Sequence, residues 1–183
     1  MPPEVITADF FTNQHRVRGR IFTGDRRLTD VLNDQLYSSL ELSEVEVARV
    51  IEPEKVVYTY PSAVLMKEAI ALVIIPGERR NGAEGRIFKF IEKRPYEVVL
   101  TVPPYEISGV LHLRGTGDLR MLLVREVGHF VPMTQAQAVF TLFPKVKFFG
   151  EVAIVNKALL EVVGALETPD TPDTIFDGRT GAG

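Results

Sequence analysis

The chain has 183 residues, a formal net charge of −3 and 45% hydrophobic residues, which suits one medium-sized globular domain or two small ones. It contains no cysteine, so disulfide frameworks, thiol catalysis and thiolate metal sites are excluded. The slightly negative charge argues against a dedicated nucleic-acid binder, and the longest apolar runs, 69–76 and 158–166, are too short to span a bilayer.

The first predicted elements are two β-strands. Residues 5–11 are rich in β-formers and end at a turn near Thr12. In the following segment, Val17 and Ile21 share one side of an extended chain, and the three arginines between and before them share the other. Gly19 lies at the centre of this strand and predicts a bulge or a sharp bend there.

A short helix is expected next, over residues 30–35. Thr29 fits its N-cap and Asp30 its first turn, where a carboxylate meets the positive end of the helix dipole. Strand character returns at residues 40–47, and 55–60 and 64–75 read as two further strands or one hairpin, with a turn near Met66.

The same order of elements is expected to begin again after a linker rich in Gly, Pro and charge at 76–85. The second series comprises a connector strand, a first strand, a Gly109 strand, a short helix with Asp118 as its cap, a long strand and a closing segment: 86–91, 97–102, 106–113, 119–126, 130–143 and 146–163. From residue 167 the sequence is acidic and nearly free of apolar residues, so we expect disorder.

Residues 16–48 and 106–139 read as two copies of one fragment. With Gly19 set on Gly109, the apolar residues on either side of the glycine coincide, and so do those of the later strand. We therefore predict a first unit at 1–78, a second at 79–166 and a tail at 167–183. The first unit carries an acidic excess of about four and the second a basic excess of similar size.

The pattern G-x-I…R-L-T-D-x-L-N…L-x-L in the first unit resembles a bacterial family of uncharacterised small single-copy domains. Its residues here are Gly19, Ile21, Arg27, Leu28, Thr29, Asp30, Leu32, Asn33, Leu40 and Leu42. A bent sheet with a glycine at the bend is also loosely similar to small β-barrels of the Sm-like and SH3-like type. The fold expected is mainly β, as two tandem small barrel or roll units in a pseudo-twofold pair, each with one short helix.

Arg27, Thr29, Asp30 and Asn33 form the polar centre of the first unit and are candidates for binding a partner or a small anion, because a helix start beside arginines attracts anions. The alternative is a capped helix in which Asp30 neutralises Arg27. In the second unit Asp118, Met121 and Val124 stand at the positions of Arg27, Asp30 and Asn33.

Arg16, Arg18 and Arg20 form a basic strand face that could follow a phosphate backbone. The alternative is a solvated face whose arginines pair with acidic residues of the neighbouring strand, which are Glu41, Glu44 and Glu46.

No catalytic, metal or cofactor site is expected. The three histidines are scattered and lack the spacing of metal ligands or of a nucleophile–base pair, and the glycines form no phosphate loop. We expect a cytoplasmic, non-catalytic scaffold or protein-interaction module that binds a protein partner or associates with itself. A nucleic-acid-binding module and a sensor of a small ligand or anion, using a cleft between the units, remain as alternatives.

Overall fold

The computed structural model describes residues 4–76, 93–114, 119, 123–124, 126 and 128–166. Residues 77–85 of the predicted linker, the connector strand 86–91, the cap at Asp118, half of the second helix and the tail 167–183 lie outside the described residues. The first half of the described chain contains β1 (Glu4–Phe11), β2 (His15–Gly24), α1 (Leu28–Asn33), β3 (Ser39–Arg49), β4 (Val56–Met66), the 3-10 helix η1 (Lys67–Ala69) and β5 (Leu72–Ile75). The second half contains β6 (Lys93–Val102), β7 (Tyr105–Arg114), β8 (Phe130–Phe140), β9 (Lys147–Asn156), η2 (Lys157–Leu159) and β10 (Val162–Ala165).

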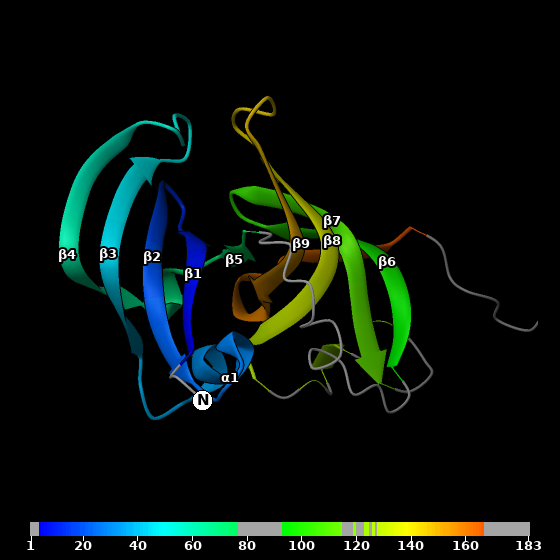
Figure 1. Ribbon diagram of the computed structural model, residues 1–183. Coiled ribbons are helices and arrows are strands. Elements are labelled where there is room, and N and C mark those ends of the chain that lie inside the picture. Colours follow the sequence, from blue (N-terminus) through cyan, green and yellow to red (C-terminus); the bar gives the residue numbers. More distant parts are fainter. Residues whose placement is uncertain are drawn as a thin grey trace, which may run out of the picture.

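These strands form one antiparallel ten-stranded sheet in the order β10-β6-β7-β8-β9-β5-β1-β2-β3-β4. The predicted mainly β fold is confirmed. Both halves use the same order, because β5-β1-β2-β3-β4 in the first corresponds to β10-β6-β7-β8-β9 in the second. Strand β5 joins the halves by pairing with β9 in the middle of the molecule (Figure 1).

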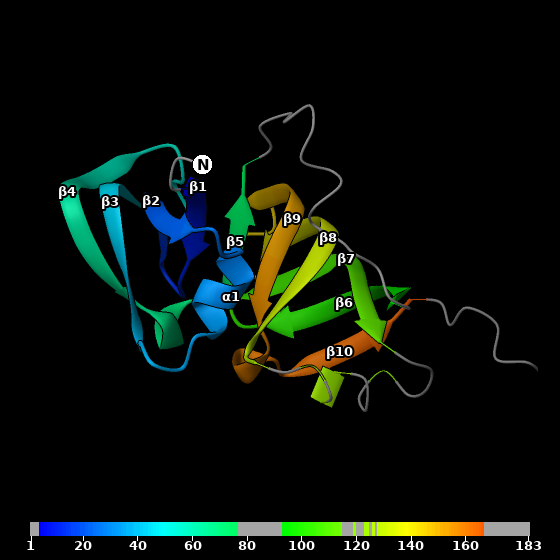
Figure 2. The same cartoon turned by 60° about the horizontal axis from the view of Figure 1, so that its bottom comes forward.

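The sheet remains open at both ends. Within the described part of the chain, β4 and β10 each have a neighbouring strand on one side only. The two strands lie at opposite ends of the molecule (Figure 2).

A β-bulge lies beside Gly19, where a bulge or a bend was predicted, but its extra residue belongs to the opposing strand, and the second half repeats this arrangement at Gly109. The β2–β3 register shifts between Arg18 and Arg20, and the β7–β8 register shifts between Ser108 and Val110. Gly19 and Gly109 occupy these two shifts. The opposing strands carry matching left-handed residues, Glu44 with a φ of 51° and Gln135 with a φ of 52°, so both halves bend at the same place.

The helix begins earlier than predicted. Arg27, not Thr29, is the N-cap residue of α1, and the Asp30 carboxylate accepts a hydrogen bond from the Arg27 backbone N–H at 3.3 Å. Asp30 therefore stabilises the helix start as the third helical residue, a role that carboxylates fill in capping boxes. Leu28 and Leu32 are buried beneath the helix.

Two hydrophobic cores fill the curved sheet, and each takes side chains from both halves. The core of the first half includes Phe130 and Ile154 from the second. The core of the second half includes Phe11, Val50 and Leu72 from the first. Among the described residues, no helix is long and apolar enough to cross a membrane.

Candidate interaction surfaces

Polar residues around the start of α1 contact one another, and Arg26 and Asp34, which lie outside the predicted set, make most of these contacts. Arg26 donates to the Asp34 carboxylate and to the Asp30 backbone carbonyl, both at 3.0 Å. The pKa of Asp34 is lowered, chiefly by the hydrogen bond it accepts from the Leu36 backbone N–H and then by Arg26. Thr29 is half-buried, and Arg27 and Asp30 meet at the helix start as described above. These contacts fit the alternative interpretation, in which the polar residues cap the helix and bind no ligand.

Asn33 contacts the second half instead of the polar residues of its own helix. Its side-chain amide donates to the Phe130 carbonyl at 2.8 Å, and its amide oxygen accepts from the Phe130 backbone N–H at 2.8 Å. The amide thus takes the place of a neighbouring strand at the beginning of β8. Sequence analysis grouped Asn33 with Arg27 by proximity in the chain, and the partner 97 residues away gave no local signal.

The arginine row on β2 is paired with carboxylates. Arg16 and Arg18 both contact the buried Asp9 of β1, at 3.1 Å and 2.9 Å, and the hydrogen bond to Asp9 is the main reason that the pKa of Arg18 is raised. Arg20 pairs with Glu44 at 2.6 Å. The predicted cross-strand neutralisation is present at Glu44, whereas sequence analysis missed Asp9, since its partners became adjacent only through the β1–β2 pairing.

Lys67 and Lys157 each donate hydrogen bonds to two backbone carbonyls of a segment far away in the chain. Sequence analysis singled out neither lysine. The Lys67 ammonium donates to the backbone carbonyls of Val31 and Asp34, both at 2.8 Å, and its burial lowers its pKa. Lys157 likewise donates to the carbonyls of Leu123 and Glu126. The two lysines start η1 and η2, so the internal repeat was the signal that could have found them.

Tyr105 fastens the beginning of β7 to the first half. It is fully buried, and its hydroxyl donates to the Thr12 backbone carbonyl at 2.6 Å. Burial also raises the pKa of the hydroxyl.

Tyr105→Phe is expected to lower the free energy of unfolding by about 1 kcal/mol, because the carbonyl of the half-buried Thr12 loses its donor while the ring packing is kept. Urea unfolding followed by circular dichroism measures the change. Tyr58→Phe, at a side chain that is 55% exposed, is the matched control and should be neutral. Equal stability of both variants would contradict this role.

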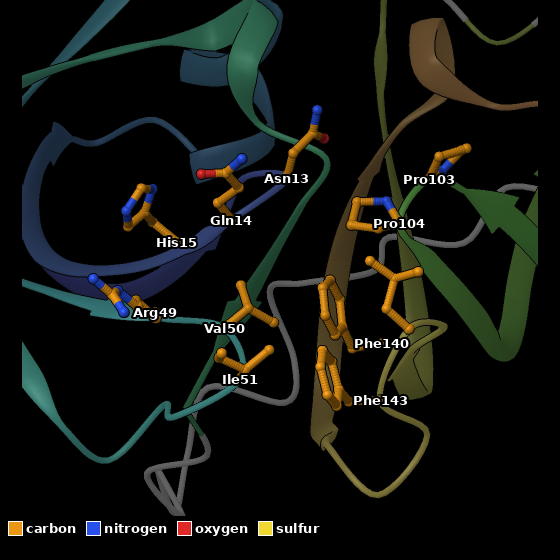
Figure 3. A pocket seen from close by; sticks show the side chains of 11 residues that line it. Asn13, Gln14, His15, Arg49, Val50, Ile51, Pro103, Pro104, Phe140 and Phe143 are labelled. Atoms are coloured by element: carbon orange, nitrogen blue, oxygen red, sulfur yellow. The ribbon is translucent and has the colours of Figure 1, made fainter.

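A cleft of about 460 Å³ opens between the halves, where hairpin ends from both meet. Phe140 and Phe143 lie on one side, and His15 and Arg49 lie on the other (Figure 3). The two phenylalanine rings are parallel within 5°. The lining is mainly apolar and open to solvent. The cleft therefore has an aromatic wall, formed by Phe140 and Phe143, opposite the side chains of His15 and Arg49.

The edge strand β4 exposes a series of large apolar side chains. We call this the β4 edge surface; its members are 41% to 65% exposed and are Val56, Val57, Tyr58, Tyr60, Val64 and Met66. The Tyr58 and Tyr60 rings are stacked with centroids 6.2 Å apart. An exposed apolar strand with an unpaired backbone is a template for pairing with another chain.

The histidines lie in separate parts of the structure and do not form a common site. His15 lines the cleft, and His112 lies 2.9 Å from the Thr134 hydroxyl. Within the ranges that the structure describes, no group of three or more His, Asp or Glu side chains is arranged to hold a metal ion. No protein-family model, curated protein or solved structure matches this chain.

Proposed function

We propose that this protein is a non-catalytic scaffold that associates with itself through the free edges of its sheet. The single observation that carries the proposal is the β4 edge surface, an eleven-residue apolar strand with no neighbour on its outer side among the described residues. Its long and exposed form differs from edges that proteins protect by charge or shortness. Among the described residues, β4 carries two edge-protecting features, a register shift near its start and Pro61, and five residues of β4 follow Pro61.

We further propose that the halves are copies of one small barrel- or roll-like unit. The shared strand order, the two bulges and the paired lysines support this duplication. The seam pairs β5 with β9, which are not equivalent strands, so a head-to-tail relation is favoured over the expected pseudo-twofold pair.

The alternatives have weaker support. A nucleic-acid interface on β2 would have to compete with Asp9 and Glu44 for its arginines. An anion site at α1 would have to displace the contacts among Arg26, Asp30 and Asp34. The cleft between the halves supports a small-ligand site, but its lining is mainly apolar and does not indicate which ligand would bind.

Val64→Lys tests the proposal. Val64 is 65% exposed in the monomer, so the lysine leaves the fold intact but would place a charge inside an edge-to-edge contact. Phe22→Lys is the matched control, because Phe22 is also 65% exposed but lies on β2, away from either edge.

Light scattering coupled to size exclusion measures the outcome. We expect the natural chain and Phe22→Lys to have masses that are multiples of 20.4 kDa, and Val64→Lys to shift towards the monomer. A natural chain that stays monomeric up to about millimolar concentration, far above the dissociation constants of stable complexes, would refute self-association.

A further inference from the structure

The seam inside the molecule shows how two such units pair. Strands β5 and β9 are antiparallel, with Leu72 opposite Val155, Val73 opposite Ile154, Ile74 opposite Ala153 and Ile75 opposite Val152. The central residues of this seam are at most 4% exposed. At its end, the Asn156 backbone N–H donates to the Ala71 carbonyl at 3.0 Å, and its side chain donates to the Ile70 carbonyl.

The two free edges are formed by the strands equivalent to those of the seam. Each β10 residue follows its β5 counterpart by 90 positions, as Val162 follows Leu72. From Val57 onwards, β4 residues precede their β9 counterparts by the same interval: Leu65 is opposite Leu40 in β3, and Val155 is opposite Val131 in β8. One edge therefore carries the β5-type strand, and the other carries the β9-type strand.

Both edges expose apolar side chains at positions whose counterparts are buried in the seam. Strand β10 has the sequence VVGA, and Val162 is 58% exposed, whereas its counterpart Leu72 is fully buried. Val64 is 65% exposed, whereas its counterpart Ile154 is 1% exposed. A strand pairing that repeats the seam would bury these apolar side chains and satisfy both backbone edges.

We infer that a second copy of this chain completes each edge, with β10 of one molecule pairing antiparallel to β4 of the next. This inference rests on the proposed function and specifies its contact. The edges lie at opposite ends of the molecule (Figure 2), so the contact is head-to-tail and propagates into a ring or a filament. The acidic excess of the first unit and the basic excess of the second favour the same orientation.

The seam also fixes the register. Transferring its pairs by 90 residues places Val162 opposite Leu65, Val163 opposite Val64 and Gly164 opposite Ala63. Pro61, which lacks a backbone donor, stays outside these pairs. Met66 stands where the seam has Asn156, so the contact between molecules lacks the side-chain hydrogen bond to the loop before β10 and is weaker than the seam.

Disulfide trapping tests this register directly, because the natural chain has no cysteine. Ala63→Cys and Gly164→Cys are made in separate chains, one of them enlarged by a tag, then mixed and oxidised. Directly opposite residues lie within the Cα separation that a disulfide spans. A Cβ at Gly164 would meet only the Val99 carbonyl oxygen at 4.0 Å, so the cysteine fits there.

We expect a mixed-size dimer from Ala63→Cys with Gly164→Cys, at a yield at least about tenfold above that from Tyr60→Cys with Gly164→Cys, whose residues are three positions out of register. A chain carrying both Ala63→Cys and Gly164→Cys should give a ladder of covalent multiples. Each variant's urea unfolding curve verifies that the fold is retained.

The alternative outcomes separate the two proposals. Efficient dimers of Ala63→Cys with itself would show pairing of β4 with β4, which overturns the head-to-tail contact but keeps a self-associating scaffold. Equal yields from the two mixed pairs would overturn the register. A protein that neither crosslinks nor associates in light scattering would overturn both proposals.

Discussion

Gly109→Ala is expected to destabilise the protein by about 3 kcal/mol, at the upper end for overpacking a core. A Cβ added at Gly109 would lie 2.6 Å from the Met133 methyl carbon, 2.9 Å from the Thr134 carbonyl oxygen and 3.2 Å from the Ala136 Cα. Two of these atoms belong to the backbone of β8, so the side chain of Met133 could move aside but the strand could not.

Gly19→Ala is the matched control, because it makes the same change at the same place in the other half. There the added Cβ would meet side-chain atoms only, at 3.2 Å and 3.3 Å for Leu42 and at 3.5 Å for Val45. We expect a loss of about 1 kcal/mol or less, since a small side-chain shift relieves the contact and alanine reduces the entropy of the unfolded chain. Urea denaturation of both variants measures the difference. Equal losses would show that the close approach at Gly109 is relieved by backbone movement.

Asn33→Ala is expected to destabilise the protein by about 2 to 4 kcal/mol. The change removes both 2.8 Å hydrogen bonds to the backbone of Phe130, a residue that is 4% exposed. It would leave a buried donor and a buried acceptor without partners, each costing about 1 to 2 kcal/mol. Gly128 permits the contact, because a Cβ there would lie 2.4 Å from the Asn33 side-chain carbonyl.

Asn13→Ala is the control for Asn33→Ala, since Asn13 is exposed in the β1–β2 turn and its loss should change stability by less than about 0.5 kcal/mol. Thermal and urea unfolding provide the measurement, and light scattering reports whether association survives. If Asn33→Ala were as stable as the natural chain yet failed to associate, Asn33 would be an interaction residue, as its sequence context predicted, and not a bond between the halves.

The sequence predicted the features that depend on neighbours within one strand or one turn. Alternation placed Val17 and Ile21 in the core and the β2 arginines on the opposite face. The alignment of Gly19 with Gly109 marked the two places where the register shifts, because a residue without a side chain is favoured where strands approach closely, although the extra residue lies in the opposing strand. The same alignment predicted two similar series of strands.

The contacts that fix the candidate surfaces form only when strands pair or when the two halves pack together. Asp9 meets its arginines through strand pairing, and Tyr105 meets Thr12 across 93 residues. No local pattern indicated that β5, which pairs with β1 of its own half, would also pair with β9 of the other half. The helix start was misplaced for a local reason, because the helix begins at Leu28 with Arg27 as its N-cap residue, and the Asp30 carboxylate accepts a hydrogen bond from the Arg27 backbone N–H.

The exchange of side chains between the two cores has a mechanical consequence. Phe130 and Ile154 complete the first core, and Phe11 and Leu72 complete the second, so neither half can loosen while the other keeps its packing. The seam cannot serve as a hinge, and the molecule responds to force or heat as a single stiff body. In an assembly, all bending between neighbours would therefore be confined to the junctions between molecules, and the curvature of one junction would set the size of the whole.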